Sequence, residues 1–145
     1  MTVVPIVALD PDLPVPAYAR PGDAGADLAA RVDALLAPGG GRAVVPTGMA
    51  VELPLGFAGL ILPRSGLARR HGVTCLNTPG LIDSGYRGEL EVLLVNTDPS
   101  APYQIHRGDR IAQLVIVAVE HARFAPVTAL GRSERGEQGW GHSGR

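Results

Sequence analysis

The sequence predicts an all-β domain of the sandwich, jelly-roll or barrel type, and three observations support this prediction. The 145 residues include 19 glycines and 13 prolines, which favour turns and leave little room for long helices. Short apolar runs alternate with these turn residues along nearly the whole chain. Because 46% of the residues are apolar and the formal net charge is only -1, the chain can form one hydrophobic core. We therefore expect a single β domain without parallel βαβ units.

The expected strands are short runs of β-compatible composition, each followed by turn residues. They are residues 2–9, 42–54, 56–63, 72–77, 88–96, 110–119 and 124–130. The segment SGLARRHG, residues 65–72, predicts one or two helical turns that end at Gly72. One segment conflicts with an all-β fold, because residues 27–37 carry apolar side chains at helical spacing after Asp27, a suitable N-cap. Pattern alone predicts a helix there.

The C-terminal segment is expected to be a flexible arm, residues 131–145, attached to a β domain of residues 1–130. The arm is rich in glycine, yet it holds Trp140, the only tryptophan of the chain. A large aromatic ring gains most when it covers another surface. The arm is therefore a candidate lid.

Composition excludes several classes of protein. The near-neutral charge argues against a general binder of nucleic acid or of anionic membranes, so any phosphate site must be local. The longest apolar run, around IAQLVIVAV, is too short to span a membrane. Cys75 is the only cysteine, which forbids an internal disulfide, and the first residues show no signal-peptide pattern. We expect a cytoplasmic protein that binds neither nucleic acid nor membrane.

Asp83 is the first candidate for chemistry. It follows an apolar pair in the glycine-rich segment NTPGLIDSGYRGELEVLLVN, which is typical of a hairpin that returns into a buried strand. A turn aspartate that satisfies backbone amides is one interpretation. A general base for a water molecule is the other, and Tyr86 and Arg87 favour it because a turn needs neither an aromatic ring nor a cation.

Three further features could bind a phosphorylated ligand. Arg64, Ser65 and Gly66 precede a helix start, where a guanidinium, a hydroxyl and free amides can hold an anion, although an N-cap serine is an equally good explanation. Gln113 lies in a buried strand and needs a partner, either a core group or a ligand. Asp27, near Asp23, is either a turn or capping residue or a carboxylate for Mg²⁺. The histidine spacing, the absence of lysine and the absence of a Gly-x-Ser-x-Gly segment argue against zinc, Walker and α/β-hydrolase sites.

Taken together, five segments resemble in order the five motifs of the trimeric deoxyuridine triphosphate nucleotidohydrolases, the dUTPases. These segments are DAGADL, PRSGLA, NTPGLIDSGYRGE, RGDRIAQL and RGEQGWGHSG. The resemblance implies a distorted jelly-roll-like β-barrel with one short helix, and strand and loop over residues 27–37. It also implies a homotrimer with active sites at the subunit interfaces. The implied reaction is Mg²⁺-assisted hydrolysis of dUTP to dUMP and pyrophosphate by in-line attack of water on the α-phosphorus, which supplies the dTMP precursor and keeps uracil out of DNA.

The resemblance also implies a role for each matching residue. Asp83 matches the residue that activates the attacking water, and Asp27 matches the carboxylate that holds Mg²⁺ through water. The matching substrate-binding positions are Arg64, Ser65, Gly66 and Gln113 for the triphosphate, Asn77 with Gly80 and Ile82 of the hairpin for uracil, Tyr86 for deoxyribose, and Arg135, Trp140 and Ser143 in the arm. Within the arm, Arg135 matches a γ-phosphate ligand and Trp140 the ring that stacks on uracil. Two arm residues depart from the family pattern, Gln138 in place of glycine and His142 in place of a small hydroxyl residue.

Two other functions remain open at this point. A dCTP deaminase, or a bifunctional deaminase that also cleaves the triphosphate, belongs to the same fold family. The tyrosine in IDSGYRGE and the glycine-rich arm favour the hydrolase. A non-catalytic nucleotide-binding regulator is the second alternative, and the presence of Asp83 favours an enzyme.

Overall fold

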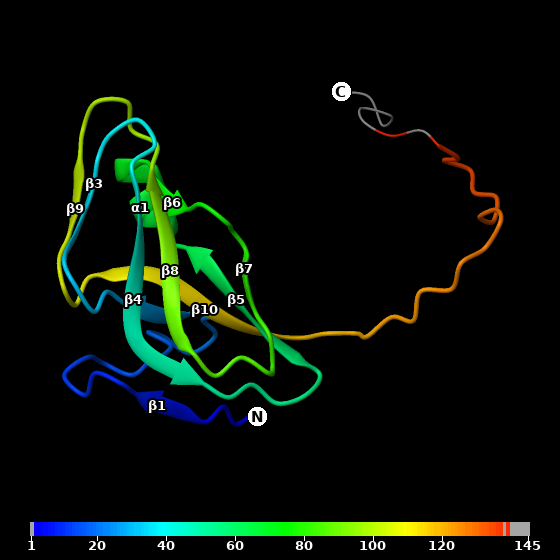
Figure 1. The fold of residues 1–145 in the computed structure, drawn as a ribbon, viewed down its shortest axis with the longest axis horizontal. Helices are drawn as coiled ribbons and strands as arrows, with labels where there is room; N and C mark the ends of the chain where they lie inside the picture. The colour runs from blue at the N-terminus through cyan, green and yellow to red at the C-terminus, as the bar shows by residue number, and fades with distance from the viewer. Residues whose placement is uncertain (1, 138, 140–145) are drawn as a thin grey trace.

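The computed structural model describes residues 2–137 and 139, which form a distorted jelly-roll-like β-barrel with one short helix (Figure 1). One sheet has the order β1-β4-β8-β6, made of β1 (Ile6–Ala8), β4 (Arg42–Val51), β8 (Glu89–Asn96) and β6 (Val73–Cys75). A second has the order β2-β10-β5-β7, made of β2 (Ala26–Ala29), β10 (Arg110–Ala118), β5 (Phe57–Pro63) and β7 (Gly80–Ile82). A two-stranded sheet pairs β3 (Ala34–Leu36) with β9 (Tyr103–Ile105). Every recorded strand pair is antiparallel, and the all-β prediction is confirmed.

The core lies between the two large sheets and follows the alternation of their strands. In β8, Leu90, Val92 and Leu94 are buried while Glu91 between them is exposed, as expected for a strand with one face on the core. Fully buried side chains come from both sheets and from β3 and β9, and the largest are Leu28, Leu36, Met49, Leu90, Leu94, Ile105 and Ile111. The barrel thus provides a rigid frame on which strand ends and loops can hold polar groups.

The helix that periodicity predicts over residues 27–37 is absent. The segment instead forms β2 and β3, joined by a short turn. Leu28 and Leu36 are fully buried from two separate strands, whereas Leu35 is exposed, so the apparent helical spacing arises from two strands that face one core. Pairing with β10 and β9 overrides the local pattern. The strand and loop implied by the family resemblance are confirmed.

Helix α1 (Ser65–His71) agrees with the sequence at its end and differs at its start. Gly72 adopts the left-handed conformation, with φ of 64°, and its amide donates to the carbonyl of Ala68, as in a glycine C-cap. Arg64, not Ser65, is the N-cap residue, and no side chain caps the helix. The interpretation of Ser65 as an N-cap is therefore wrong, and its hydroxyl is not used in capping.

The chain leaves the barrel after β10. The amide of Val119 donates to the carbonyl of Gly56 at 2.9 Å, and no hydrogen bond or ion pair joins residues 120–134 to residues 2–118. Figure 1 shows this segment extending away from the barrel. The strand predicted over 124–130 does not form, and Phe124 in it is 93% exposed. No helix within the described residues is long and apolar enough to cross a membrane.

Candidate functional site

The carboxylate of Asp27 is the centre of a charged cluster on the second sheet. Its Oδ1 lies 3.2 Å from Nε of Arg64, and its Oδ2 lies 3.0 Å from Nη1 of Arg110. The side-chain amide of Gln113 donates to Oδ1 at 3.4 Å. Arg64 also donates to the backbone carbonyl of Arg110 at 3.2 Å. The structure therefore brings together Asp27, Arg64 and Gln113, three residues that the sequence marks for phosphate and metal binding.

Strand register accounts for this cluster. Gln113 on β10 lies directly opposite Asp27 on β2, and both point away from the core between buried neighbours. Arg64 follows the end of β5, the other neighbour of β10. Gly25 leaves the space that the glutamine needs, because a Cβ at this position would lie 3.0 Å from Cβ of Gln113. An alanine at position 25 would therefore push Gln113 away from Asp27.

Arg110 belongs to the cluster, although the sequence analysis assigned it no role. In a regular strand, Arg110 and Gln113 would face opposite sides of the sheet. The register of β10 against β2 shifts between Arg110 and Ala112, and this irregularity lets both side chains reach Asp27. Sequence periodicity predicts the wrong face for Arg110. The signal that could have found it is its place in the segment RGDRIAQL, beside Gln113.

The start of α1 adds donors beside the cluster. The first amides of a helix have no acceptor within it, and the exposed Ser65 carries a hydroxyl at this end. The guanidinium of Arg70 lies over Gly66, since a Cβ on this glycine would be 3.1 Å from Nη2 of Arg70. Sequence reasoning also missed Arg70. With Arg64 and Arg110 nearby, the surface has more guanidinium groups than carboxylates and suits a polyanion such as a chain of phosphates.

Asp83 differs from Asp27, because its carboxylate has no hydrogen-bond or ion-pair partner within the described residues. Asp98 shows what a turn aspartate does in this chain. It accepts the backbone amides of Ser100 and Ala101, and these bonds lower the pKa of its carboxyl group. Asp83 accepts none, so the interpretation of its carboxylate as a turn residue that satisfies amides is not supported. The side chain is exposed and available for another group.

The hairpin around Asp83 is held by its neighbours. The amide of Tyr86 donates to the carbonyl of Asp83 at 3.0 Å. Arg87 donates to the carbonyls of Ser84 and Tyr86 at 2.7 and 2.9 Å, and its Nη2 pairs with Glu52 at 3.0 Å. These bonds fix the backbone that presents the free carboxylate.

Asn77, Gly80 and Ile82 lie together at the start of this hairpin. Gly80 is buried, and a Cβ there would lie 3.4 Å from both Nδ2 of Asn77 and Cβ of Ile61. The exposed amide of Asn77 therefore extends over a bare stretch of backbone. Ile82 is half-buried and packs against the core, which fixes this end of β7. The exposed side-chain amide of Asn77, beside a glycine, can recognise a flat polar ring through paired hydrogen bonds.

Within one chain, the hairpin and the Asp27 cluster lie far apart. On β5, the register places Gly59 opposite Ile82 and Ile61 opposite Gly80, so Asp83 lies beyond one end of the ladder and Arg64 beyond the other. Along β5, the position level with Asp83 and the position of Arg64 are six residues apart, which corresponds to about 20 Å. A phosphorus atom bound by Arg64 is therefore out of reach of Asp83 of the same chain.

The arm is described only in part. Nη2 of Arg135 donates to the carbonyl of Gly139 at 3.1 Å. Trp140, Ser143, Gln138 and His142 lie outside the described residues. Asp23 has a turn role, because its Oδ2 accepts the amide of Arg20 at 2.8 Å. No group of three or more histidine, cysteine, aspartate or glutamate side chains suited to a metal occurs in the described part of the chain.

The fold and the cluster define an all-β protein with an arginine-rich surface whose charge suits a polyanion. The dUTPase family model matches residues 12–144, and the chain belongs to the dUTPase family. It is similar to the deoxyuridine 5'-triphosphate nucleotidohydrolase of Thermobifida fusca, with 59% identity over 97% of this chain and 78% of the relative. The enzyme of the same name from Corynebacterium glutamicum is 52% identical over 100% of this chain and 97% of its own.

Solved structures agree with this assignment. The dUTPase of Staphylococcus bacteriophage 80alpha, determined with dUPNHPP, superposes with a TM-score of 0.90 at 28% identity and full coverage of both chains. A mutant dUTPase from phage phi11 of S. aureus, described with a structural Mg(II) ion, superposes with a TM-score of 0.80 at 26% identity, over 90% of this chain and 100% of its own.

Proposed function

We propose that this protein hydrolyses dUTP to dUMP and pyrophosphate and so supplies the dTMP precursor while keeping uracil out of DNA. The observation that carries the proposal is the family match over residues 12–144, which includes all five motif segments. The free carboxylate of Asp83 and the arginine-rich surface around Asp27 support a hydrolytic role over simple binding.

In this proposal the cluster on the second sheet binds the triphosphate. Arg64 and Gln113 supply charged and amide donors, and the hydroxyl and amides of Ser65 and Gly66 add donors at the helix start. Asp83 accepts a proton from water while the water oxygen bonds to the α-phosphorus. The bond from this phosphorus to the bridging oxygen breaks, and pyrophosphate leaves with that oxygen. The guanidinium groups stabilise the charge that moves onto the leaving group.

Mg²⁺ fits the donor set that the structure provides. Asp27 is a single half-buried carboxylate, and Mg²⁺ in nucleotide sites often takes one or two protein carboxylates with several waters and the substrate phosphates. Asp27 is the residue that would hold the ion, through water. When bound, Mg²⁺ neutralises phosphate charge. Arg64 and Arg110 pair with both oxygens of Asp27, so the phosphates would compete with Asp27 for Arg64.

The hairpin supports recognition of deoxyuridine. Asn77, with the backbone of Gly80 and Ile82, presents polar groups to the edge of uracil. Cytosine would leave these groups mispaired, and the methyl group of thymine would meet the hairpin backbone. The ring of Tyr86 lies beneath the deoxyribose and leaves no space for a 2'-hydroxyl group.

We propose a homotrimer whose active sites are shared between subunits. The separation of about 20 Å between Asp83 and Arg64 supports this arrangement, because each site then takes these residues from two chains. The arm of residues 131–145 would close the site of a neighbour through Arg135, Trp140 and Ser143, with Trp140 over the uracil.

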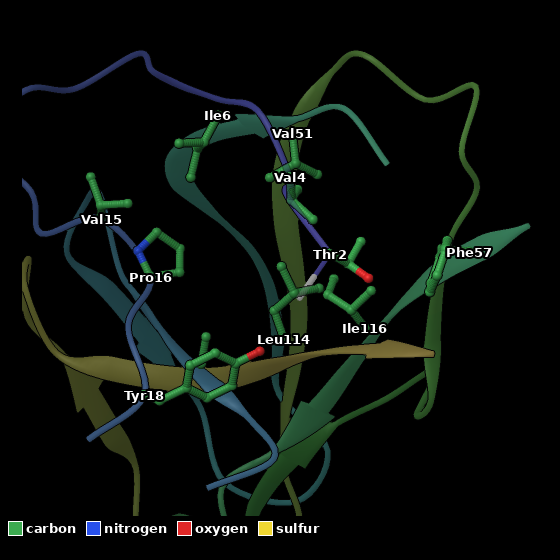
Figure 2. A pocket seen from close by; sticks show the side chains of 11 residues that line it. Thr2, Val4, Ile6, Val15, Pro16, Tyr18, Val51, Phe57, Leu114 and Ile116 are labelled. Carbon is green, nitrogen blue, oxygen red and sulfur yellow. The ribbon is translucent and has the colours of Figure 1, made fainter. Parts of the chain in front are cut away.

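The segment of residues 120–130, which leads from β10 to the arm, has apolar side chains that its own barrel does not cover. Phe124, Val127 and Leu130 are 93%, 66% and 89% exposed. An apolar cleft of about 500 Å³ lies between the N-terminal segment and β5 and β10. Figure 2 shows Tyr18, Leu114 and Phe57 among its lining side chains. In the trimer, this cleft would receive these side chains of a neighbour's residues 120–130.

We also propose that the protein is cytoplasmic, where thiols stay reduced. Cys75 is a buried unpaired thiol, and burial raises its pKa to about 11, which keeps it protonated and unreactive.

The direct test is release of pyrophosphate from dUTP with and without Mg²⁺. We expect Mg²⁺-dependent release from dUTP and far slower release from dCTP and dTTP. Ammonia release from dCTP would support the deaminase alternative instead. Tight binding of dUTP with no pyrophosphate release would support the non-catalytic regulator and contradict the proposal.

A further inference from the structure

A bulge in β4 is filled by a carboxylate from β8. The ladder between these strands is interrupted between Pro46 and Ala50, where Gly48 has a φ of 73°. The amide of Gly48 donates to Oε1 of Glu89 at 2.6 Å, and the hydroxyl of Thr47 donates to the carbonyl of Leu90 at 2.8 Å. Two side chains thus replace the missing ladder bonds and join the base of the Asp83 hairpin to β4.

Glu89 is also held from its other side by a chain of charges. Nη1 of Arg31 lies 3.2 Å from Oε2 of Glu89, and Nε of Arg31 lies 3.4 Å from Asp10. Arg107 binds Asp10 with both terminal nitrogens and donates to the carbonyl of Arg31 at 2.8 Å. The side chains of Asp10 and Glu89 are only 14% and 21% exposed. The network leaves Glu89 little freedom to move.

The backbone of Glu89 connects this anchor to Tyr86. The phenol hydroxyl of Tyr86 donates to the carbonyl oxygen of Glu89 at 2.8 Å. The ring folds back over Gly88, where any Cβ would overlap the hydroxyl and ring atoms of Tyr86. The position of the ring therefore depends on where residues 88 and 89 lie.

We propose that Glu89 is a positioning residue for sugar selection, acting through Tyr86. Its carboxylate, fixed by the Gly48 amide and Arg31, holds the carbonyl group that receives the Tyr86 hydroxyl. The ring is thereby kept where a 2'-hydroxyl group would collide with it. This inference rests on the proposed hydrolysis of dUTP, and it assigns to Glu89 and Arg31 a role in selectivity that lies outside the phosphate cluster.

The test compares dUTP and UTP as substrates of the full chain. The ratio of kcat/KM for the two nucleotides does not depend on the fraction of active protein, so a general loss of stability leaves it unchanged. We expect Glu89→Ala to lower this ratio by about tenfold, because the carboxylate bonds to Gly48 and Arg31 that hold the backbone carbonyl of residue 89 in place are lost. Thr47→Val is the matched control, because it removes the neighbouring bond in the same bulge. It should lower the melting temperature but leave the ratio unchanged.

Two further variants keep the inference testable. Glu89→Gln retains an acceptor for Gly48 but loses the charge opposite Arg31, so the ratio should fall by about threefold. If Glu89→Ala fails to fold, this variant decides. In a double-mutant cycle, we compare the dUTP/UTP ratio of Tyr86→Phe, of Glu89→Ala and of the double variant. If Glu89 acts through Tyr86, the ratio of the double variant should not fall below the lower of the two single-variant ratios.

Unchanged ratios in the folded Glu89 variants would overturn the inference, as would an equal fall in Thr47→Val. Absence of pyrophosphate release by the parent protein is a separate outcome, which contradicts the proposed function itself.

Discussion

Asp27 and Asp83 are two carboxylates of one proposed active site, yet the chain treats them in opposite ways. Asp27 is half-buried on β2, one edge strand of the second sheet, and is bound by two arginines and an amide. Asp83 is exposed on a hairpin at the sheet edge, and its carboxylate has no partner in the described part of the chain. The charge of the first is balanced by partners within its own chain, whereas the second is positioned by its backbone alone.

The difference between the two carboxylates follows from their different proposed roles. A group that must attract and arrange phosphates can be assembled within one subunit, because its partners also balance its charge. A base must keep a free lone pair for a proton, so it cannot be paired in the same way. Placing the base about 20 Å away along the sheet keeps it clear of the clustered arginines of its own chain.

The largest expected effect is that of Asp83→Asn. Turnover of dUTP should fall by about a thousandfold, because the amide cannot accept the proton of water. The free energy of unfolding should change by less than about 0.5 kcal/mol, because the replaced carboxylate has no partner to lose. Steady-state kinetics and thermal unfolding of the same preparation measure both quantities. If Asp83→Asn lost stability but kept its turnover of dUTP, Asp83 would be a structural residue, which would contradict its role as the base.

Arg64→Gln should have the next largest effect. Loss of a charge-assisted bond to phosphate is expected to lower kcat/KM for dUTP by about thirtyfold. Arg110→Gln is the matched control, since Arg110 also pairs with Asp27 but its side chain is 57% exposed, against 26% for Arg64. The control should cost less than about threefold, as is common for exposed pairs. Equal losses would show that both arginines bind phosphate.

Asp27→Asn should have a moderate effect of a different kind. The Mg²⁺ concentration for half-maximal activity should rise by about tenfold, because a neutral amide binds hydrated Mg²⁺ more weakly. In contrast with Asp83→Asn, the free energy of unfolding should fall by about 1 kcal/mol, since Arg64 and Arg110 lose the charge between them. Magnesium titration and chemical denaturation give the two results. An unchanged Mg²⁺ requirement would remove Asp27 from the metal site.

Asp10 gives the smallest effect and extends the comparison to a paired carboxylate outside the site. The hydrogen bonds from Arg107 lower the pKa of Asp10 to about 2. A lowered folded-state pKa stabilises the protein above the ordinary value near 4, and the contribution is lost as the pH falls toward 2. The difference in melting temperature between the parent and Asp10→Asn should therefore shrink from pH 4 to pH 2. A difference that stays constant over this range would exclude the Arg107 pair as its source.

Much of the fold could be predicted from turn residues and alternating strands, but not the parts that depend on pairing. Residues 27–37 have helical spacing and form two strands, because β10 and β9 supply partners that a local pattern cannot reveal. The short strand β9 lay outside the expected runs, and residues 124–130 are β-compatible in composition but have no strand to pair with in their own barrel.

The site shows the same limit. The motif segments identify Asp27, Arg64, Gln113 and Asp83, and the structure places the first three together. Arg110 could not be assigned to the cluster because an irregularity in β10 reverses its side. Glu89 was not singled out because its importance lies in a bulge of another strand. Trp140 and Ser143 lie outside the described residues, and their roles stay predictions.

Mixing two impaired variants tests the shared site most directly. Asp83→Asn and Arg64→Ala subunits are unfolded together in equal amounts, refolded into mixed trimers and assayed for pyrophosphate release. If each site takes Asp83 and Arg64 from different chains, random assembly leaves about one quarter of the sites with both native residues. We therefore expect about one quarter of the parent activity. No recovery in trimers verified to contain both subunits would show that Asp83 and Arg64 act within one chain, and would contradict the account.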